Sequence, residues 1–227
     1  MRTEHGLVPK GQGWFVLNAR DAQWWEREGR GALCEFEGAG FEGALDFEQL
    51  GINLTVLGPG EPMAMYHWEG DQEDFLVLRG EAVVVIEGEE RQLRAWDFVH
   101  CPAGTQHVIV GAGDEPCVLL CVGARGRSTG SQWGAYTVDE AALRHGAGVE
   151  RETTEPREAY SRFPPGRLTR YREGLLPPSP DGTARTPRAA HQRRFAAKLS
   201  IIRRTLARVS PVAFGPRTTW IWKNRPA

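Results

Sequence analysis

The stretch Tyr66–Gly80 reads YHWEGDQEDFLVLRG, and it places an imidazole and several carboxylates around the junction of two β-like runs. On an extended strand His67 and Glu69 are two residues apart, so their side chains project from the same face. A turn through the following Gly-Asp-Gln then allows Glu73 to open the next strand beside them. One imidazole and two carboxylates make an incomplete ligand set for a divalent metal ion.

A second stretch, Pro102–His107 (PAGTQH), supplies the missing ligand. Its Pro-x-Gly turn sets the start of a new strand at His107. The sequence therefore predicts a metal site formed by two histidines and two glutamates: His67, Glu69, Glu73 and His107. The alternative is a metal-free network of buried His and Glu side chains, because buried polar groups must be hydrogen-bonded whether or not a metal is present.

Residues 14–122 form a succession of short β-like runs separated by Gly, Pro and acidic turns, with no helical period between them. Runs of this length and spacing predict a sandwich or closed barrel. Two short helices are expected further on, over Val138–His145 and Pro156–Arg162. The expected strands are Trp14–Asn18, Ala32–Glu37, Ile52–Leu57, Met63–Glu69, Glu73–Leu78, Ala82–Glu87, Arg91–Ala95, Asp97–Cys101, His107–Val110 and Cys117–Val122.

The two stretches resemble the paired motifs of the cupin superfamily. The first family motif carries Gly, His-x-His, Glu and Gly in that order, and the second carries Gly, Pro-x-Gly, His and Asn. In this chain the first motif reads Glu61, His67, Glu69, Glu73 and Gly80, and the second reads Trp96, Pro102, Gly104, His107 and Gly111. The opening glycines are thus replaced by Glu61 and Trp96, the second histidine by Glu69, and the closing asparagine by Gly111.

The resemblance implies an all-β cupin jelly-roll barrel (a double-stranded β-helix), here with short C-terminal helices and a basic tail. It also implies a homodimer and a metal-dependent enzyme for a small oxygen-rich molecule, of the dioxygenase, isomerase, epimerase or decarboxylase class. The alternative is a non-catalytic barrel that binds or senses a small molecule such as a sugar, since a fold does not choose among functions.

The donor set bears on which metal is expected. Two histidines and two glutamates favour Mn, Fe(II) or Zn over copper. The residues His67, Glu69 and His107 also have the form of a facial triad of two histidines and one carboxylate. In that arrangement Glu73 would be a base or a weak fourth ligand.

Charge is segregated along the chain: residues 178–227 hold 11 of the 28 Lys and Arg residues and only one acidic residue, Asp181. We expect N-terminal strands and a packing arm over 1–48, the barrel core over 49–125, a loop and short helices over 126–177, and a basic extension over 178–227. Apolar residues recur at intervals of three and four within Ala189–Val209, which predicts an amphipathic helix. Such a helix can bind nucleic acid or an anionic membrane, but the pattern favours docking on the acidic barrel or a mobile extension.

Other features bear on the compartment. No apolar run is long enough to span a bilayer, and the N-terminus lacks the apolar core of a secretory signal, so the expected compartment is the cytoplasm. The four cysteines form no CxxC pair and no zinc-type spacing. We expect them to be small buried residues outside any disulfide framework.

Overall fold

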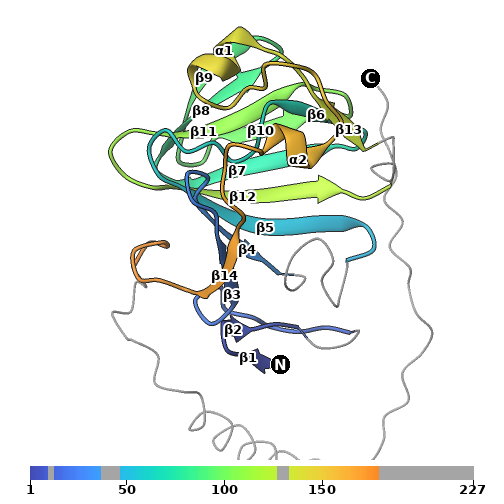
Figure 1. Cartoon of the computed structure of the whole chain (residues 1–227). Helices are drawn as coiled ribbons and strands as arrows, with labels where there is room; N and C mark the ends of the chain where they lie inside the picture. The colour runs from blue at the N-terminus through green and yellow to red at the C-terminus, as the bar shows by residue number, and fades with distance from the viewer. Residues whose placement is uncertain (10–12, 37–46, 127–132, 179–227) are drawn as a thin grey trace, which may run out of the picture. The chain divides into compact units, whose positions relative to one another are not determined.

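A computed structural model of the chain describes residues 1–9, 13–36, 47–126 and 133–178 (Figure 1). The described helices are α1 (Glu140–Arg144) and α2 (Pro156–Ala159). The strands are β1 (Arg2–Thr3), β2 (Gly6–Leu7), β3 (Gln23–Glu26), β4 (Ala32–Glu35), β5 (Leu50–Leu57), β6 (His67–Glu69), β7 (Glu73–Arg79), β8 (Glu81–Ile86), β9 (Glu89–Arg94), β10 (Phe98–Cys101), β11 (His107–Ala112), β12 (Cys117–Ala124), β13 (Gly134–Tyr136) and β14 (Arg167–Arg170).

Two antiparallel sheets contain twelve of the fourteen described strands. The first has seven strands in the order β10-β7-β12-β5-β4-β3-β14, and the second has five in the order β13-β6-β11-β8-β9. Their inner faces share one apolar cluster, which includes Phe75 of β7, Leu119 of β12, Val84 of β8 and Ile109 of β11. Strands that are consecutive in sequence repeatedly lie in different sheets. The expected all-β jelly-roll barrel is confirmed.

The inner strands β8 and β11 of the five-stranded sheet are buried on both faces, and their sequences reflect this. On β8, Ala82 and Val84 face the barrel interior, whereas Val85 packs on the outer side with Tyr66 and with Ala142 of α1. The run of four buried residues in β8 is therefore apolar throughout instead of alternating. The side chain of Asp139 caps α1 by accepting a hydrogen bond from the backbone N–H of Ala142 at 2.8 Å.

Several expected elements differ in extent. The strand expected over Met63–Glu69 is confined to β6, because residues 63–66 run irregularly into the barrel. No strand forms over Trp14–Asn18. In contrast, β3 was not expected: its Trp24 is fully buried, and the strand extends the seven-stranded sheet between β4 and β14. Whether Trp14–Asn18 or the β3 segment becomes a strand depends on pairing with strands far away in the sequence. The local pattern does not encode that pairing.

Three residues that differ from the family motifs at their opening and closing positions can be explained by the structure. Trp96 lies in the turn before β10 with φ of 79°, so it keeps the left-handed backbone that suits the glycine it replaces. The side chain of Glu61 accepts a hydrogen bond from the backbone N–H of Gly58 at 2.7 Å. A Cβ atom at Gly111 would lie 2.2 Å from the carbonyl oxygen of Gly58, so the asparagine of the family motif has no room here.

Two expectations concern the remaining chain. Neither helix of the described residues has the length and apolar character needed to traverse a bilayer. The amphipathic helix expected within the basic extension falls in residues 179–227, outside the described part of the chain.

Candidate metal centre

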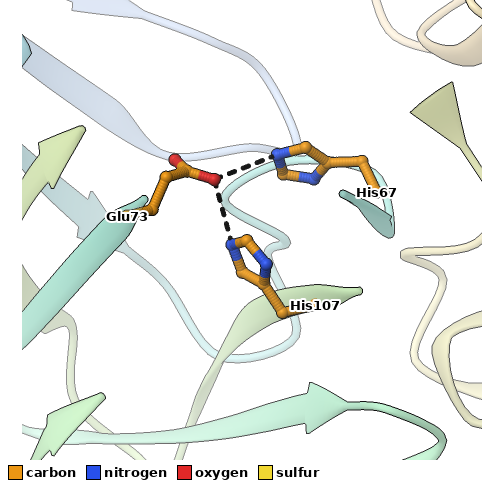
Figure 2. Close-up of side chains that lie close together, drawn as sticks. All are labelled: His67, Glu73 and His107. Atoms are coloured by element: carbon orange, nitrogen blue, oxygen red, sulfur yellow. Dashed lines mark ion pairs between the residues drawn. The ribbon is translucent and has the colours of Figure 1, made fainter. Parts of the chain in front are cut away.

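Three strands bring the candidate ligands together. His67 of β6 and His107 of β11 are direct cross-strand partners in the five-stranded sheet. Glu73 opens β7 in the other sheet, because the turn through residues 70–72 crosses from one sheet to the next. The Glu73 carboxylate therefore faces both imidazoles across the barrel interior, where the sequence had suggested a neighbouring strand (Figure 2).

One oxygen atom of Glu73 lies close to both rings. Its Oε2 is 3.6 Å from Nε2 of His67 and 3.3 Å from Nε2 of His107 (Figure 2). The three residues can each offer one ligand atom so that these atoms all lie within 4.8 Å of one another. Distances of this size between donors fit a single ion coordinated by all of them, as cation–ligand bonds of about 2 Å require.

Glu69, the fourth predicted ligand, lies at the margin of this group. Its Oε1 is 3.6 Å from Nε2 of His67, and its side chain is 28% exposed compared with 15% for Glu73. Glu69 is not among the three residues whose ligand atoms all lie within 4.8 Å of one another. Glu69 thus borders the centre on the solvent side.

Backbone carbonyl groups fix the orientation of both imidazoles. Nδ1 of His67 lies 2.8 Å from the carbonyl oxygen of Met65, and Nδ1 of His107 lies 3.0 Å from that of Thr105. A carbonyl oxygen only accepts hydrogen bonds, so Nδ1 is the protonated nitrogen in each ring. In the neutral rings Nε2 then carries a lone pair, and both lone pairs are directed into the site. This is the arrangement of metal-binding histidines, whose second nitrogen is usually held by a carbonyl or carboxylate.

The centre is electrostatically prepared for a cation. Burial disfavours the charged form of His67, but the carboxylates of Glu69 and Glu73 outweigh it and raise the pKa of His67 well above 6.5. Burial likewise disfavours the Glu73 carboxylate, but the two imidazoles outweigh it and lower the pKa of Glu73 to about 2. Glu73 is therefore ionised at neutral pH, and a positive charge beside it is favoured.

The hydrogen bonding of two buried atoms indicates whether a metal ion fits the centre. Glu73 Oε2 and His107 Nε2 have no hydrogen-bond partner in the described chain, although both are shielded from solvent. Such atoms are rare in folded proteins because each costs desolvation free energy. Both are good ligands for a divalent cation, so the donor set fits the metal that the motif implies.

Residues from outside the two motifs also reach the centre. Tyr136 of β13 pairs with His67, and the centroids of their rings are 5.9 Å apart. The ring of Tyr160, which follows α2, meets Tyr136 edge-on at 5.5 Å. Arg30, in the turn before β4, stacks its guanidinium 3.9 Å from the centroid of Tyr160. Sequence analysis missed all three residues, because nothing in their local pattern distinguishes them from ordinary aromatic and surface positions.

The fold and the centre together define a jelly-roll barrel protein with a His-Glu-His candidate metal site. The family model described as "Cupin domain" matches residues 53–123, which contain all of the predicted ligands. Residues 53–123 of the chain are thus a cupin domain.

Several solved structures are similar to the chain. A sugar phosphate isomerase from a cupin superfamily of Silicibacter pomeroyi is 28% identical with a TM-score of 0.36, over 48% of this chain and 63% of that chain. The TT1209 protein of Thermus thermophilus is 30% identical with a TM-score of 0.33, over 35% and 76%. The DMSP lyase of Ruegeria pomeroyi is 25% identical with a TM-score of 0.37, over 44% and 50%. The chain thus spans less than two thirds of the isomerase and of the lyase. No curated protein matches the sequence.

Proposed function

We propose that this protein is a metal-dependent enzyme that acts on a small oxygen-rich molecule inside the barrel. The observation that carries the proposal is the pair of imidazoles of His67 and His107, each locked by a backbone carbonyl so that Nε2 faces the Glu73 carboxylate. A purely structural network would be expected to satisfy these atoms with hydrogen bonds, whereas Glu73 Oε2 and His107 Nε2 are left without any.

In this proposal His67, Glu73 and His107 hold a divalent ion of the Mn, Fe or Zn kind, and Glu69 completes the set as a more weakly bound fourth ligand. A bound ion of this kind supplies a Lewis acid that polarises a carbonyl, hydroxyl or enol oxygen of the substrate. The protein supplies the fixed donor geometry and a largely dry, apolar surrounding made by residues such as Phe75, whose ring lies 5.3 Å from that of His107.

Tyr136 is suited to donate a hydrogen bond in this site. Burial raises its pKa, and the neighbouring Tyr160 and Glu69 raise it further. Its hydroxyl therefore stays protonated at neutral pH, so Tyr136 can stabilise a developing negative charge on a substrate oxygen but cannot act as the resting base. A proton acceptor in the reaction is better supplied by a carboxylate such as Glu69.

Elemental analysis of the purified, untagged protein tests the proposal. The wild-type protein should contain close to one equivalent of metal, and His107→Ala should lose it. The exposed His100, whose Nδ1 lies 2.7 Å from Asp74 Oδ1, provides a matched control, since His100→Ala removes an imidazole outside the centre and should keep the metal. Iron would direct screening toward oxygen chemistry, and zinc or manganese toward isomerase or hydrolytic chemistry.

The opposite result has a clear meaning. If the wild-type protein contains no metal and takes up none when Mn, Fe(II) and Zn are supplied, the metalloenzyme proposal fails. The non-catalytic barrel that binds a small molecule would then be the better account.

We also propose that the protein forms a homodimer, as the cupin resemblance implies. The edge strand β10 supports this, because it presents Phe98 63% exposed and follows Trp96, which is 74% exposed. An exposed apolar sheet edge is a favourable site for pairing with a second copy. Light scattering of the wild-type protein should give the dimer mass, and Phe98→Lys should shift it toward the monomer.

A further inference from the structure

Two arginines from the N-terminal part of the chain approach the metal centre from the turn between β3 and β4. Arg27 donates from Nη1 to the carbonyl oxygen of Met63 at 3.3 Å, on the segment that leads into β6 and His67. Arg30 stacks on Tyr160, whose hydroxyl accepts a hydrogen bond from the backbone N–H of Met65 at 3.4 Å. Arg27 therefore contacts the short segment Met63–Met65 that leads to the first histidine, and Arg30 is linked to the same segment through Tyr160.

The guanidinium of Arg27 is hydrogen-bonded to the backbone of Met63, whose side chain packs against the barrel core. The buried thiol of Cys121, on the inner face of β12, is affected by two opposite charges: Glu73 raises its pKa and Arg27 lowers it, although burial has the largest effect. The carboxylate of the metal centre and the guanidinium of Arg27 thus both act electrostatically on one side chain of the barrel interior.

Three nitrogen atoms of these two guanidinium groups are left without a hydrogen-bond partner in the described part of the chain. Within the described residues, Nε and Nη2 of Arg27 and Nε of Arg30 have no hydrogen-bond partner, although they are hidden from solvent. A guanidinium is planar and always carries its charge at neutral pH, so leaving its donors unpaired in a buried place is costly. Arg27 also has Arg30 as a neighbour of like charge.

Within the described residues, neither arginine forms an ion pair with a carboxylate. Burial lowers the pKa of Arg27 to about 10, with Arg30 as the next cause, and the only carboxylate that opposes them is Glu35, the weakest influence of all. Burial also lowers the pKa of Arg30, opposed by Tyr160 and Tyr136 and by no carboxylate. Both side chains remain charged at neutral pH, so an anion placed between them would remove the repulsion and satisfy the free donors.

We propose that Arg27 and Arg30 form an oxyanion subsite that binds a carboxylate or phosphate group of the substrate beside the metal centre. The subsite rests on the proposed function, because it assigns a negative charge to the molecule that the barrel takes up. Carboxylate and phosphate share the pair of oxygens that a guanidinium binds in a bidentate manner. The remaining part of such a substrate would extend toward His67 and Tyr136.

Calorimetric titration with two simple anions tests this subsite. Inorganic phosphate and glycolate would be titrated separately into the full-length, chelator-treated protein in a chloride-free buffer. We expect one anion per chain, and whichever binds more tightly identifies the group as phosphate or carboxylate. Arg27→Met should weaken binding by about 10- to 100-fold, the range for losing hydrogen bonds to a charged group. Arg27→Lys, which keeps the charge but not the planar fork, should fall between Arg27→Met and wild type.

Arg91→Met is the matched control. Arg91 is an exposed arginine that pairs with Glu89 on β9, away from the centre, so anion binding should stay within about twofold of wild type. Thermal unfolding separates lost binding from lost folding. Without added anion, Arg27→Met should unfold at the same temperature as Arg91→Met or higher, because it removes an unpaired buried charge.

The subsite proposal would be overturned if the wild-type protein bound neither anion, or if Arg27→Met bound the anion as tightly as wild type. It would also be overturned if Arg27→Met unfolded at a markedly lower temperature than Arg91→Met without anion. The last would make Arg27 a structural residue. The titration is done without metal, so its result does not depend on whether the proposed metal site exists. Failure of the metal proposal can therefore be told apart from failure of the anion subsite. We expect Arg27→Met to keep its metal and His107→Ala to keep its anion affinity.

Discussion

Glu73 Oε2 lies 3.3 Å from His107 Nε2, yet the two atoms do not form a hydrogen bond. Nδ1 of His107 donates to the carbonyl oxygen of Thr105, so the ring in its neutral form presents the lone pair of Nε2 to the carboxylate. Two lone pairs that face each other in a buried place require a cation between them. A proton on the ring or a metal ion can fill this role, and of the two a metal ion could be held by Glu73, His67 and His107 together.

The first prediction separates the two carboxylates of the centre. Glu73→Gln should weaken metal binding by at least about 100-fold, because it removes the charge of a buried, central ligand, whereas Glu69→Gln should cost about tenfold. Competition with a chromophoric chelator measures both affinities. An effect of Glu69→Gln equal to that of Glu73→Gln would show instead that the facial triad is built on Glu69.

A second prediction concerns the closing position of the second motif. Gly111→Ala should lower the free energy of unfolding by about 3 kcal/mol, the upper end for overpacking, because its Cβ would meet the carbonyl oxygen of Gly58 at 2.2 Å. That carbonyl belongs to a backbone turn and cannot move aside like a flexible side chain. Urea unfolding measures the change.

Gly123→Ala is the control for this comparison. Gly123 also lies in a strand of the barrel, but the nearest atom to its added Cβ would be Glu73 Cγ at 3.9 Å, an ordinary contact. Its free energy of unfolding should stay within about 1 kcal/mol of wild type. Similar losses for both glycine variants would contradict the steric explanation.

A third prediction follows from the left-handed backbone at Trp96. Trp96→Gly should raise the free energy of unfolding by about 0.5–1 kcal/mol, because relief of a φ of 79° outweighs the added freedom of the unfolded chain. The side chain is 74% exposed, so little packing is lost within one chain. Chemical denaturation at low protein concentration checks the sign, and a clear destabilisation would indicate that the indole makes a stabilising contact.

A fourth prediction concerns the four buried cysteines, which are all free thiols. Burial is the main cause that raises the pKa of Cys34, Cys101 and Cys121 to about 12 and that of Cys117 to about 11. At pH 8 only about one thiol in a thousand or fewer is ionised, so a thiol reagent should react slowly with the native protein and fully with the unfolded protein.

The same shifts predict alkaline destabilisation. A thiol whose pKa is raised on folding contributes stability below its unfolded value of about 9 and loses this contribution as pH rises toward 11 or 12. The midpoint of urea unfolding should therefore fall steadily above pH 9. A midpoint that stays constant to pH 11, or rapid reaction of several native thiols at pH 8, would contradict the burial of these side chains.

The sequence by itself determined the strand-rich barrel and most of its inner strands. Alternating and continuous apolar runs define β5, β7, β8, β11 and β12, because burial on a pleated surface leaves a direct pattern in the residues. The spacing of His67, Glu73 and His107 also indicated a shared site, since two strand starts and a tight turn limit where these side chains can lie.

Only the tertiary structure decided the surroundings of that site. It placed Glu73 in the opposite sheet from the two histidines, brought Tyr136 beside His67 from after the family motifs, and brought Arg27 against Met63 from before them. Neither residue carries a local signal, because a side chain's neighbours across a barrel depend on sheet order and register. Those are set by cooperative packing between segments far apart in the chain, which short patterns do not encode.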